Sequence, residues 1–257
     1  MLSNMDVNEN SKRVRALLGE EAGRHGLGKA LGVAPFSSVY NALMPVQKDK
    51  LRELSGDGFD ELLQDGSVVS IAFAYPEHAI DSIAVGTEGS YDRERWNVYA
   101  REYMRLNGAL NEASARIASE IGGVAIPATS EGIAAKISHV EDYYPLVVSH
   151  RVAAEQSGVG WRGKNELIVN PRFSCAVRLA SVLTTLPLRR TPPTTMGCGD
   201  CHACLDVCPY LRNKEKLRNY REQCRLYLVS LGLVSDVCGK CVKACYRDSV
   251  YRDQFKL

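Results

Sequence analysis

Eight of the nine cysteines of this 257-residue chain occur in two sets near its C-terminus. The first set has the spacing C-x2-C-x2-C-x3-C-P and consists of Cys198, Cys201, Cys204 and Cys208, followed by Pro209. This spacing is typical of bacterial ferredoxins, where it surrounds a cubane [4Fe–4S] cluster. Iron in such a cluster prefers soft, anionic thiolates, and one short loop presents three of them. In two-cluster proteins the fourth cysteine binds the other cluster, so a second set is expected.

The second set consists of Cys224, which stands alone, and of Cys238, Cys241 and Cys245. The ferredoxin crossover predicts that one cluster is bound by Cys198, Cys201, Cys204 and Cys245. The other cluster is then bound by Cys208, Cys224, Cys238 and Cys241. A pair of structural zinc sites is the alternative, but zinc sites usually contain two separated C-x2-C pairs. We therefore predict two [4Fe–4S] clusters.

Cysteines in metal-type spacing indicate a reducing compartment rather than a disulfide scaffold. Residues 1–11 are polar and unlike a signal peptide, and no apolar stretch approaches the length of a membrane span. We therefore expect a cytoplasmic protein with no membrane partner. The net charge of +2 gives no general case for nucleic acid or an acidic membrane. The ninth cysteine, Cys175, is expected to be a buried thiol.

The length suits one medium domain followed by a small one, and the apolar fraction of 45% allows a sizeable core. Residues 189–195 are proline-rich and form a stiff connector that marks the boundary. We predict a flexible tail at 1–11, a larger domain at 12–190 and a cluster-binding domain at 191–257. The last has little hydrophobic core of its own, so cluster binding must largely fold it.

Hydrophobic periodicity places the secondary structure. Helices are expected at 12–25, 51–63, 92–121, 145–157 and 173–183. Strands are expected at 67–75, 124–128, 133–140 and 166–169, and residues 29–50 are expected to be loop-rich. The segment 92–121 carries an apolar and aromatic stripe at helical spacing and ends at Gly122-Gly123. We interpret the stripe as core packing rather than as a cofactor site.

The run from Gly158 to Gly163 matches G-x-G-x-x-G, and its extension to Lys164 matches most of a phosphate-binding P-loop. Both motifs require a strand before them and a helix after them, so that phosphate meets a helix N-terminus. Here the expected order is the reverse, which argues against nucleotide binding. The glycines still indicate a tight turn or a close approach of the backbone to a neighbour.

Residues 145–188, followed by the cysteine sets in the same order, resemble the epoxyqueuosine reductase family. The matching residues are Gly160-Trp-Arg-Gly-Lys-Asn165, Asn170-Pro-Arg172 and Leu183-Thr-Thr-Leu-Pro-Leu188. The resemblance implies an α+β fold: a nitroreductase-like, cobalamin-binding domain, shared with reductive dehalogenases, followed by a bacterial-ferredoxin-like domain with two clusters. It implies cofactor contacts by Gly160, Trp161, Gly163, Lys164, Asn165, Asn170, Pro171 and Arg172. The chain departs from the family at Glu94-Arg-Trp96, where an aspartate, a tyrosine and a histidine are usual, and at Tyr246, where a proline is usual.

Asp142-Tyr-Tyr-Pro145 is similar to the family's D-x-x-P segment, in which the aspartate is the proposed proton donor. The alternative is that Asp142 caps the helix expected to begin near Pro145. His139 and His150 flank this aspartate; each is a candidate ligand or a structural histidine. Six basic residues between the cysteine sets form either a solvated helix face or a docking surface: Arg212, Lys214, Lys216, Arg218, Arg221 and Arg225.

The resemblance implies an oxidoreductase that passes electrons through two clusters to a corrinoid, which reduces an epoxide-like or related substrate. A low-potential donor such as a ferredoxin or flavodoxin and, as substrate carrier, tRNA are the implied partners. Two other interpretations remain open. The protein is a non-catalytic electron carrier that reduces a corrinoid or flavin on a partner, or it is a two-cluster ferredoxin domain fused to a flavin-binding domain.

Overall fold

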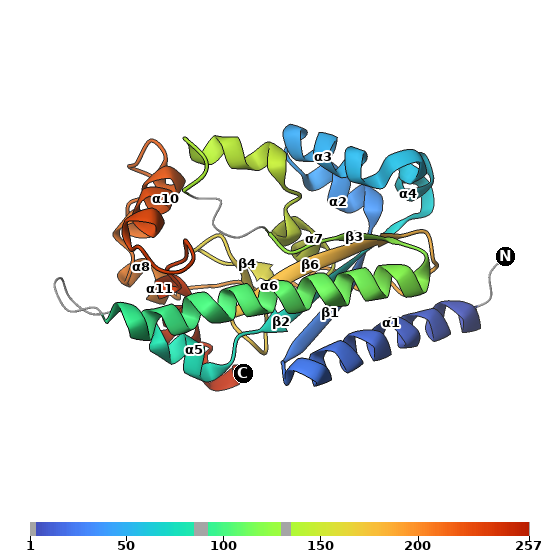
Figure 1. Ribbon diagram of the computed structural model, residues 1–257. Helices are drawn as coiled ribbons and strands as arrows, with labels where there is room; N and C mark the ends of the chain where they lie inside the picture. The colour runs from blue at the N-terminus through green and yellow to red at the C-terminus, as the bar shows by residue number, and fades with distance from the viewer. Residues whose placement is uncertain (1–3, 85–91, 130–134, 257) are drawn as a thin grey trace.

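The computed structural model describes residues 4–84, 92–129 and 135–256. Its centre is an antiparallel sheet of four strands in the order β1-β2-β6-β3 (Figure 1). The strands are β1 (Lys29–Pro35), β2 (Ser67–Ala74), β6 (Val177–Thr184) and β3 (Val124–Ile126). Helices α1 (Asn4–His25) and α6 (Arg93–Ile121) lie side by side over one face, while α2 (Phe36–Ala42) and α7 (His150–Gln156) pack against the sheet as well. The expected α+β class is confirmed.

The predicted long helix is present as α6, and local chemistry explains both of its ends. The Asp92 carboxylate accepts a hydrogen bond from Arg95 N at 3.0 Å and caps the N-terminus. Gly122 follows the last turn with φ 63°, the left-handed conformation that commonly ends a helix. Its apolar stripe, which includes Trp96 and Leu110, is buried against the sheet. The core interpretation of this stripe is therefore confirmed.

The predicted flexible tail at 1–11 is wrong for residues 4–11, because α1 begins at Asn4. Two contacts hold this part of the helix against a distant segment. Asn10 Nδ2 donates to Pro187 O at 3.2 Å, and Ser11 Oγ accepts from Arg189 N at 2.8 Å. These partners lie about 180 residues away in sequence, so local patterning did not reveal them.

The loop-rich expectation for residues 29–50 is also wrong. This segment contains β1, α2 and the start of α3 (Pro45–Ser55). Its prolines mark the boundaries of elements: Pro35 ends β1, and Pro45 occupies the first turn of α3, where its missing N–H is not needed. The helix expected at 51–63 is divided by a 3₁₀ turn at Gly56–Gly58, after which α4 (Phe59–Asp65) leads into β2.

The helix predicted at 173–183 is a strand. β6 pairs with β2 over its whole length and with β3 from Ser181 to Leu183, which makes it a central strand. A short, continuous apolar run suits a buried strand as well as a buried helix. Hydrogen bonding on both sides to segments about 60 and 110 residues earlier decides the outcome.

Other helices and strands also begin and end at residues that differ from the expected ones. The helix expected at 145–157 is a 3₁₀ segment, η2 (Val140–Leu146), followed by three extended residues and then by α7. The strand expected at 133–140 begins outside the described residues, and its described part forms turns and the start of η2. The strand expected at 166–169 is short: β5 (Ile168–Val169) pairs with β4 (Trp161–Arg162) as a hairpin. The order helix, glycine run, strand is as expected, so the nucleotide motif lacks its structural context.

After the connector, the described chain is helical. It contains α8 (Ala203–Asp206), α9 (Pro209–Arg212), α10 (Tyr220–Ser230), α11 (Lys240–Asp248) and the 3₁₀ turn η3 (Arg252–Gln254). These helices gather near the N-terminal end of α6 and near α5 (Glu77–Ser82), at the left of Figure 1. Their apolar side chains, including Val242 and Tyr246, join the core that lies under α6. None of the described helices combines the length and apolar character that a membrane span requires.

Candidate functional site

The eight cysteines of the two sets form two groups in space. Cys204 interacts electrostatically with Cys198, Cys201 and Cys245. Cys238 does so with Cys208 and Cys224, and Cys241 with all three of these and with Cys204. The ligand sets that the ferredoxin crossover implies stay a prediction. All nine cysteines of the chain are free thiols.

The thiols of both groups are poorly solvated. Burial, reinforced by neighbouring thiols, raises the pKa of Cys204 to about 12 and that of Cys224 to about 11. Such thiols lose their protons when a metal centre binds, so ligand binding and folding are coupled here. Among the described residues no three His, Cys, Asp or Glu side chains surround a single point as ligands of one metal ion do. A cubane cluster does not require such a group, because each thiolate binds a different iron atom.

Short elements position the cysteines. Cys204 lies on α8, Cys224 on α10, and Cys241 and Cys245 one turn apart on α11. Gly239, with φ 73°, is the N-cap residue before α11, and a Cβ atom there would lie 2.7 Å from Ile83 and Tyr99 side-chain atoms. Only glycine allows the second cysteine loop to approach α6 this closely.

The N-terminal half of α6 holds the cysteine-rich segment in place. Trp96 Nε1 donates to Cys238 O at 2.7 Å, and Asn97 Oδ1 accepts from Val234 N at 2.9 Å. Arg247 of α11 forms ion pairs with Asp81 at 2.6 Å and with Glu77 at 2.7 Å. Trp96 stands where the family usually has another residue, and sequence reasoning did not assign it this role. Its position within the stripe facing the core was the only available signal.

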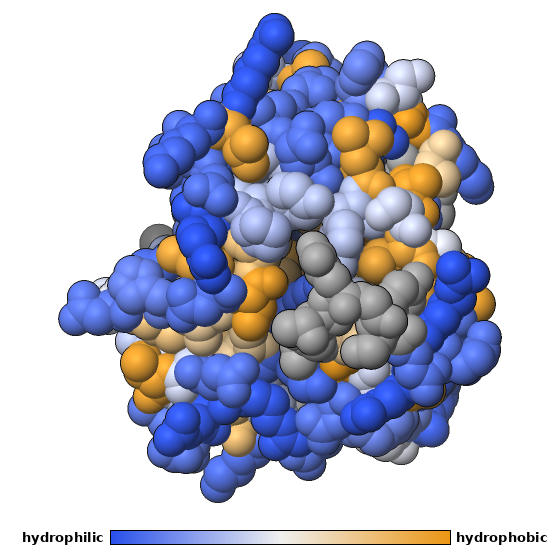
Figure 2. All heavy atoms as spheres, turned by 90° about the vertical axis from the view of Figure 1, so that its left-hand side faces the viewer, coloured by the Kyte–Doolittle hydropathy of each residue, from blue (hydrophilic) through white to orange (hydrophobic). Residues whose placement is uncertain are grey.

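The side of β6 that faces β3 is only partly covered. β2 pairs with β6 from Val177 to Thr184, but β3 pairs only with Ser181–Leu183. β3 leaves the first four residues of β6 uncovered; of these, Val177, Arg178 and Leu179 are half-buried, while Ala180 and the rest of the strand are buried. Figure 2 shows the face of the molecule that lies at the left of Figure 1, where small groups of apolar residues are scattered among hydrophilic ones.

Arg178 is the charged residue in this uncovered part of β6. Its Nε donates to Asn107 Oδ1 at 2.9 Å, and its guanidinium lies 4.2 Å from the centre of the Tyr103 ring. Tyr75 and Tyr99 stack nearby with ring centres 4.9 Å apart, and burial raises the pKa of both. Burial alone lowers the pKa of Arg178, but the surrounding tyrosines raise it overall, so the guanidinium stays charged. Among the described residues no carboxylate forms an ion pair with it.

Asp142 lies on η2 as an exposed residue. Its Oδ2 accepts hydrogen bonds from His139 N at 2.8 Å and from Ser138 N at 3.1 Å, in a capping box with His139. The carboxylate thus caps η2 from within its first turn, and not a helix that begins at Pro145. The adjacent Tyr143 is half-buried, and burial raises its pKa.

Most residues of the resemblance motifs have partners within the chain. Asn165 Nδ2 donates to Cys175 Sγ at 3.3 Å, and Lys164 Nζ donates to Gly199 O at 2.7 Å. A Cβ atom at Gly160 would lie 2.3 Å from Val169 O, and one at Gly163 would lie 2.7 Å from Asn165 Oδ1. These residues therefore hold the β4–β5 hairpin and connect it to the first cysteine loop.

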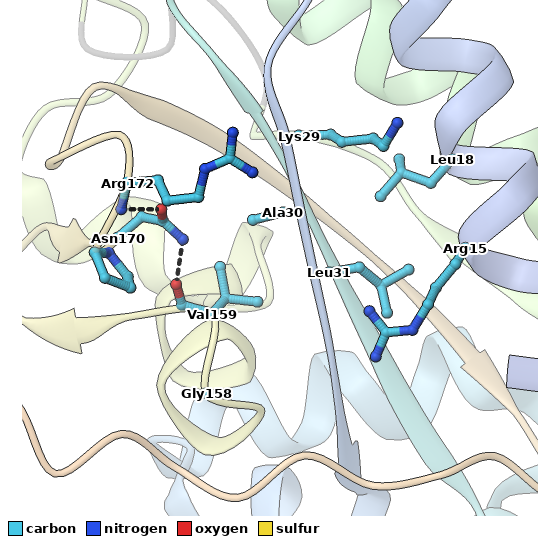
Figure 3. Close-up of a pocket in the computed structure, with 10 residues that line it drawn as sticks. Arg15, Leu18, Lys29, Ala30, Leu31, Gly158, Val159, Asn170 and Arg172 are labelled. Carbon is cyan, nitrogen blue, oxygen red and sulfur yellow. Dashed lines mark hydrogen bonds between the residues drawn. The ribbon is translucent and has the colours of Figure 1, made fainter. Parts of the chain in front are cut away.

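The second motif lies at a different place, the pocket drawn in Figure 3. Asn170, Pro171 and Arg172 line one side of this pocket of ≈ 370 Å³, and Arg15 and Lys29 line the other. The Asn170 amide is not available to a ligand there. Its Nδ2 donates to Val159 O at 2.6 Å, and its Oδ1 accepts from Arg172 N at 2.9 Å. The structure thus does not bring the two motifs together around one cavity.

His150 is a structural residue. Its Nδ1 lies 2.9 Å from Ser181 Oγ and its Nε2 lies 2.7 Å from Pro127 O, so both ring nitrogens have partners. Burial lowers its pKa to about 4 and keeps the ring neutral. A ring with both nitrogens occupied has no lone pair to offer to cobalt.

The basic residues between the cysteine sets contact different partners. Arg225 pairs with Glu222 and donates to Ile137 O and Ser138 O, next to Asp142. Arg221 and Lys214 both approach Glu166, at 3.5 and 3.6 Å. At least half of this stretch therefore ties the helices α9 and α10 to the larger part of the protein, and it does not form one continuous solvated face.

The fold and the cysteines together define a class: an α+β protein with an antiparallel central sheet and a helical segment that carries two cysteine groups. The chain matches no protein-family model. Over 192 residues it is 39% identical to the epoxyqueuosine reductase of Bacillus cereus, a match that covers 68% of this chain and 45% of that protein. The matched region thus spans less than half the length of this curated relative. The predicted resemblance is confirmed: the chain is a homologue of epoxyqueuosine reductases.

Solved structures of the same name are also similar to this chain. Epoxyqueuosine reductase from Streptococcus thermophilus has a TM-score of 0.49 and 18% identity, over 95% of this chain and 68% of that one. An epoxyqueuosine reductase in complex with an epoxyqueuosine-modified tRNA-Tyr stem loop has a TM-score of 0.40 and 20% identity, over 78% of this chain and 53% of that one.

Proposed function

We propose that this protein is a reductase of the epoxyqueuosine reductase kind that holds two [4Fe–4S] clusters and a corrinoid and reduces an epoxide-like group. The observation that carries the proposal is the arrangement of the cysteines. Thiols of the two sets lie near one another, and Cys238 O of the second set accepts a hydrogen bond from Trp96 in the N-terminal half of α6. The homologue's name supports the reaction class, although the match spans less than half of that protein.

The thiols fit iron–sulfur clusters in number, chemistry and grouping. Each group contains four cysteines, the number that a cubane cluster takes. Because buried thiols crowd each other within a group, they favour binding to a cationic iron centre that removes their protons. In this proposal Cys198, Cys201, Cys204 and Cys245 hold one cluster, and Cys208, Cys224, Cys238 and Cys241 hold the other.

The uncovered start of β6 is the proposed site of a ligand that carries hydrogen-bond acceptors. Arg178 retains donors beyond its bond to Asn107, and a half-buried cation without a carboxylate favours a ligand with oxygen acceptors. Trp161 Nε1 is a further buried donor that has no partner among the described residues. A corrinoid has a rim of carboxamides and would supply the low-potential reduction chemistry of the site. The protein's part is to bind it, to exclude water and to position a proton donor.

Asp142 is the proposed proton donor, on the basis of the sequence resemblance alone. In this role it would protonate the oxygen that leaves as the epoxide opens. A low-potential ferredoxin or flavodoxin is the proposed electron source. A modified tRNA is the proposed substrate carrier, because a protein similar to this chain is named in complex with such a tRNA stem loop.

A first experiment tests the cofactors. Protein purified without oxygen is expected to contain about eight iron and eight sulfide per chain, by the stoichiometry of two cubanes. Cobalamin titrated into it is expected to change its visible spectrum and to protect the protein from unfolding. Zinc without sulfide would exclude the clusters. Flavin bands in the spectrum would favour a flavin-binding domain. Clusters without any response to cobalamin at high micromolar concentration would favour a non-catalytic electron carrier.

The substitution Arg178→Gln tests where the corrinoid binds. If the uncovered start of β6 is the site, this substitution weakens cobalamin binding at least tenfold, since a charge-assisted hydrogen bond contributes about 1.5–3 kcal/mol. Arg52→Gln is the matched control, because Arg52 also stacks on an aromatic ring, that of Phe59 at 4.5 Å, but lies on α3. Equal affinity in the two variants would place the corrinoid elsewhere.

A further inference from the structure

The pocket of ≈ 370 Å³ in Figure 3 lies at β1, which is an edge strand of the described sheet. Helix α1 forms one wall of this pocket, and the segments around Gly158 and Arg172 form the other. The first residues of β1, from Lys29 to Leu31, lie between the two walls. None of the lining residues is a cysteine, and the proposed cluster and corrinoid sites do not use this pocket.

Three cations line the pocket, and none of the residues that line it carries a carboxylate. Arg15 belongs to α1, Lys29 is the first residue of β1, and Arg172 lies in the turn before β6. All three side chains are exposed, and no described carboxylate forms an ion pair with any of them. Because like charges around one pocket repel each other, an anion between them is favoured.

The edge of β1 adds backbone groups to these charges. Val33 turns its backbone away from β2, because Val33 O accepts from Thr191 N at 2.8 Å. Backbone direction alternates along an antiparallel strand, so Leu31 also directs its N–H and C=O away from β2. Neither group of Leu31 has a hydrogen-bond partner outside the β1–β2 ladder among the described residues. The edge therefore offers one donor and one acceptor at the pocket.

A buried amide holds one wall of the pocket in place. The Asn170 side chain donates to Val159 O at 2.6 Å and accepts from Arg172 N at 2.9 Å, so it joins the two segments of this wall. Gly158 has φ 68°, and a Cβ atom there would lie 2.2 Å from Pro192 O, so the connector supports the same wall from behind. A wall that is formed before the ligand arrives lowers the cost of ordering on binding.

We propose that this pocket binds a phosphate ester that carries a hydroxyl group, as a nucleotide or the backbone of RNA does. A phosphate presents oxygens in several directions, so cations on both sides of β1 donate to it at once. The hydroxyl donates to Leu31 O, and the buried side chains of Leu18 and Val159 contact the apolar part of the ester.

The size of the pocket agrees with this class of ligand. Pockets for small ligands measure about 300–1,000 Å³, so ≈ 370 Å³ has room for one nucleotide unit. Side-chain cations bind the phosphate here, whereas a G-x-G-x-x-G motif binds phosphate at a helix N-terminus. The inference goes beyond the proposed function, since it requires neither the clusters nor the corrinoid.

Isothermal titration calorimetry of the full chain at low salt tests the ligand class. Adenosine monophosphate is expected to bind, inorganic phosphate to bind more weakly, and adenosine not to bind at millimolar concentration. Arg15→Gln and Arg172→Gln are each expected to weaken the binding of adenosine monophosphate about tenfold, because each removes a charge-assisted hydrogen bond. Arg13→Gln is the matched control. It removes the same charge from the same helix, but Arg13 pairs with Glu120 and does not line the pocket.

A short RNA hairpin as a further probe distinguishes the two sources of the phosphate. Binding of adenosine monophosphate that depends on Arg15 and Arg172 supports a free nucleotide, and binding of the hairpin alone with the same dependence supports an RNA backbone. Equal affinity for adenosine and adenosine monophosphate would overturn the inference. So would the absence of binding by every phosphorylated probe, or unchanged affinity in both variants. Iron, sulfide and cobalamin measurements test the proposed function separately, so each can fail without the other.

Discussion

At the scale of single residues, Asp142 has one role by resemblance and another by its contacts. Two backbone N–H groups, of Ser138 and His139, donate to its carboxylate. Asp142→Ala removes this acceptor and is expected to lower the free energy of unfolding by about 1 kcal/mol, whereas Asp142→Asn keeps an acceptor oxygen and is expected to be nearly neutral. Urea unfolding monitored by circular dichroism measures both changes.

A measurement of turnover distinguishes a capping role of Asp142 from a catalytic role. If Asp142 is the proton donor, Asp142→Asn lowers kcat by about two to four orders of magnitude, because general acid catalysis is lost. Cobalamin affinity stays unchanged. Near-normal turnover of this variant would leave Asp142 as a cap only and would direct attention to Tyr143, the half-buried hydroxyl next to it.

His150 makes stability depend on pH in a defined direction. Its pKa is about 4 in the folded protein because of burial, against 6.5 ordinarily. The unfolded chain therefore takes up a proton at a higher pH than the folded protein does. The stability that the neutral ring contributes is complete above about pH 6.5 and is lost as pH falls toward 4.

Between pH 7.5 and 5.5 this residue is expected to lower the unfolding free energy by about 1 kcal/mol. Urea unfolding at the two pH values measures the difference. His150→Gln lacks the titrating ring, so its pH dependence is expected to be smaller by that amount. An equal pH dependence of the unfolding free energy in the variant and the wild type would show that folding does not lower the pKa of His150.

At the scale of elements, two glycines of the α6 region test why this helix ends where it does. Gly122 has φ 63°, so Gly122→Ala is expected to destabilise the protein by about 1 kcal/mol. Gly108 lies within the same helix with nothing near its missing Cβ. Gly108→Ala is therefore expected to stabilise by about 0.5–1 kcal/mol. Thermal unfolding of the two variants should move in opposite directions, and a shift of the same sign would refute the capping argument.

The elements that sequence predicted well are those with a long or well-bounded pattern. α6 was predicted because its stripe persists over many turns and a capping glycine follows it. β2 was predicted from a continuous apolar run that a proline stops soon after. β6 was mistaken for a helix because a run of small and apolar residues, including Cys175 and Ala180, fits either structure. Its two neighbours in the sheet are far away in sequence, so no local signal identifies it as a strand.

At the scale of the whole molecule, the cysteine-rich segment depends both on its ligands and on α6. Cys204→Ser is expected to lose one cluster, about four irons, and to expose the first cysteine loop to proteases. α11 is expected to stay in place, because Trp96 and Asp81 hold this region without help from that cluster. Metal analysis and limited proteolysis measure the two effects. Cys175→Ser is the control that keeps both clusters, and equal losses in the two variants would contradict the proposed ligand groups.

The sequence by itself determined the two cysteine sets and the long helix α6, because each follows from spacing within one segment, while the crossed ligand grouping stays a prediction. The tertiary structure alone decided what Asp142, Asn165 and Cys175 contact. It also decided that β6 is a central strand with an uncovered half and that Arg178 lies in that half. These features depend on hydrogen bonds and packing between segments that are distant in the chain, and no local pattern of residues encodes which segments meet.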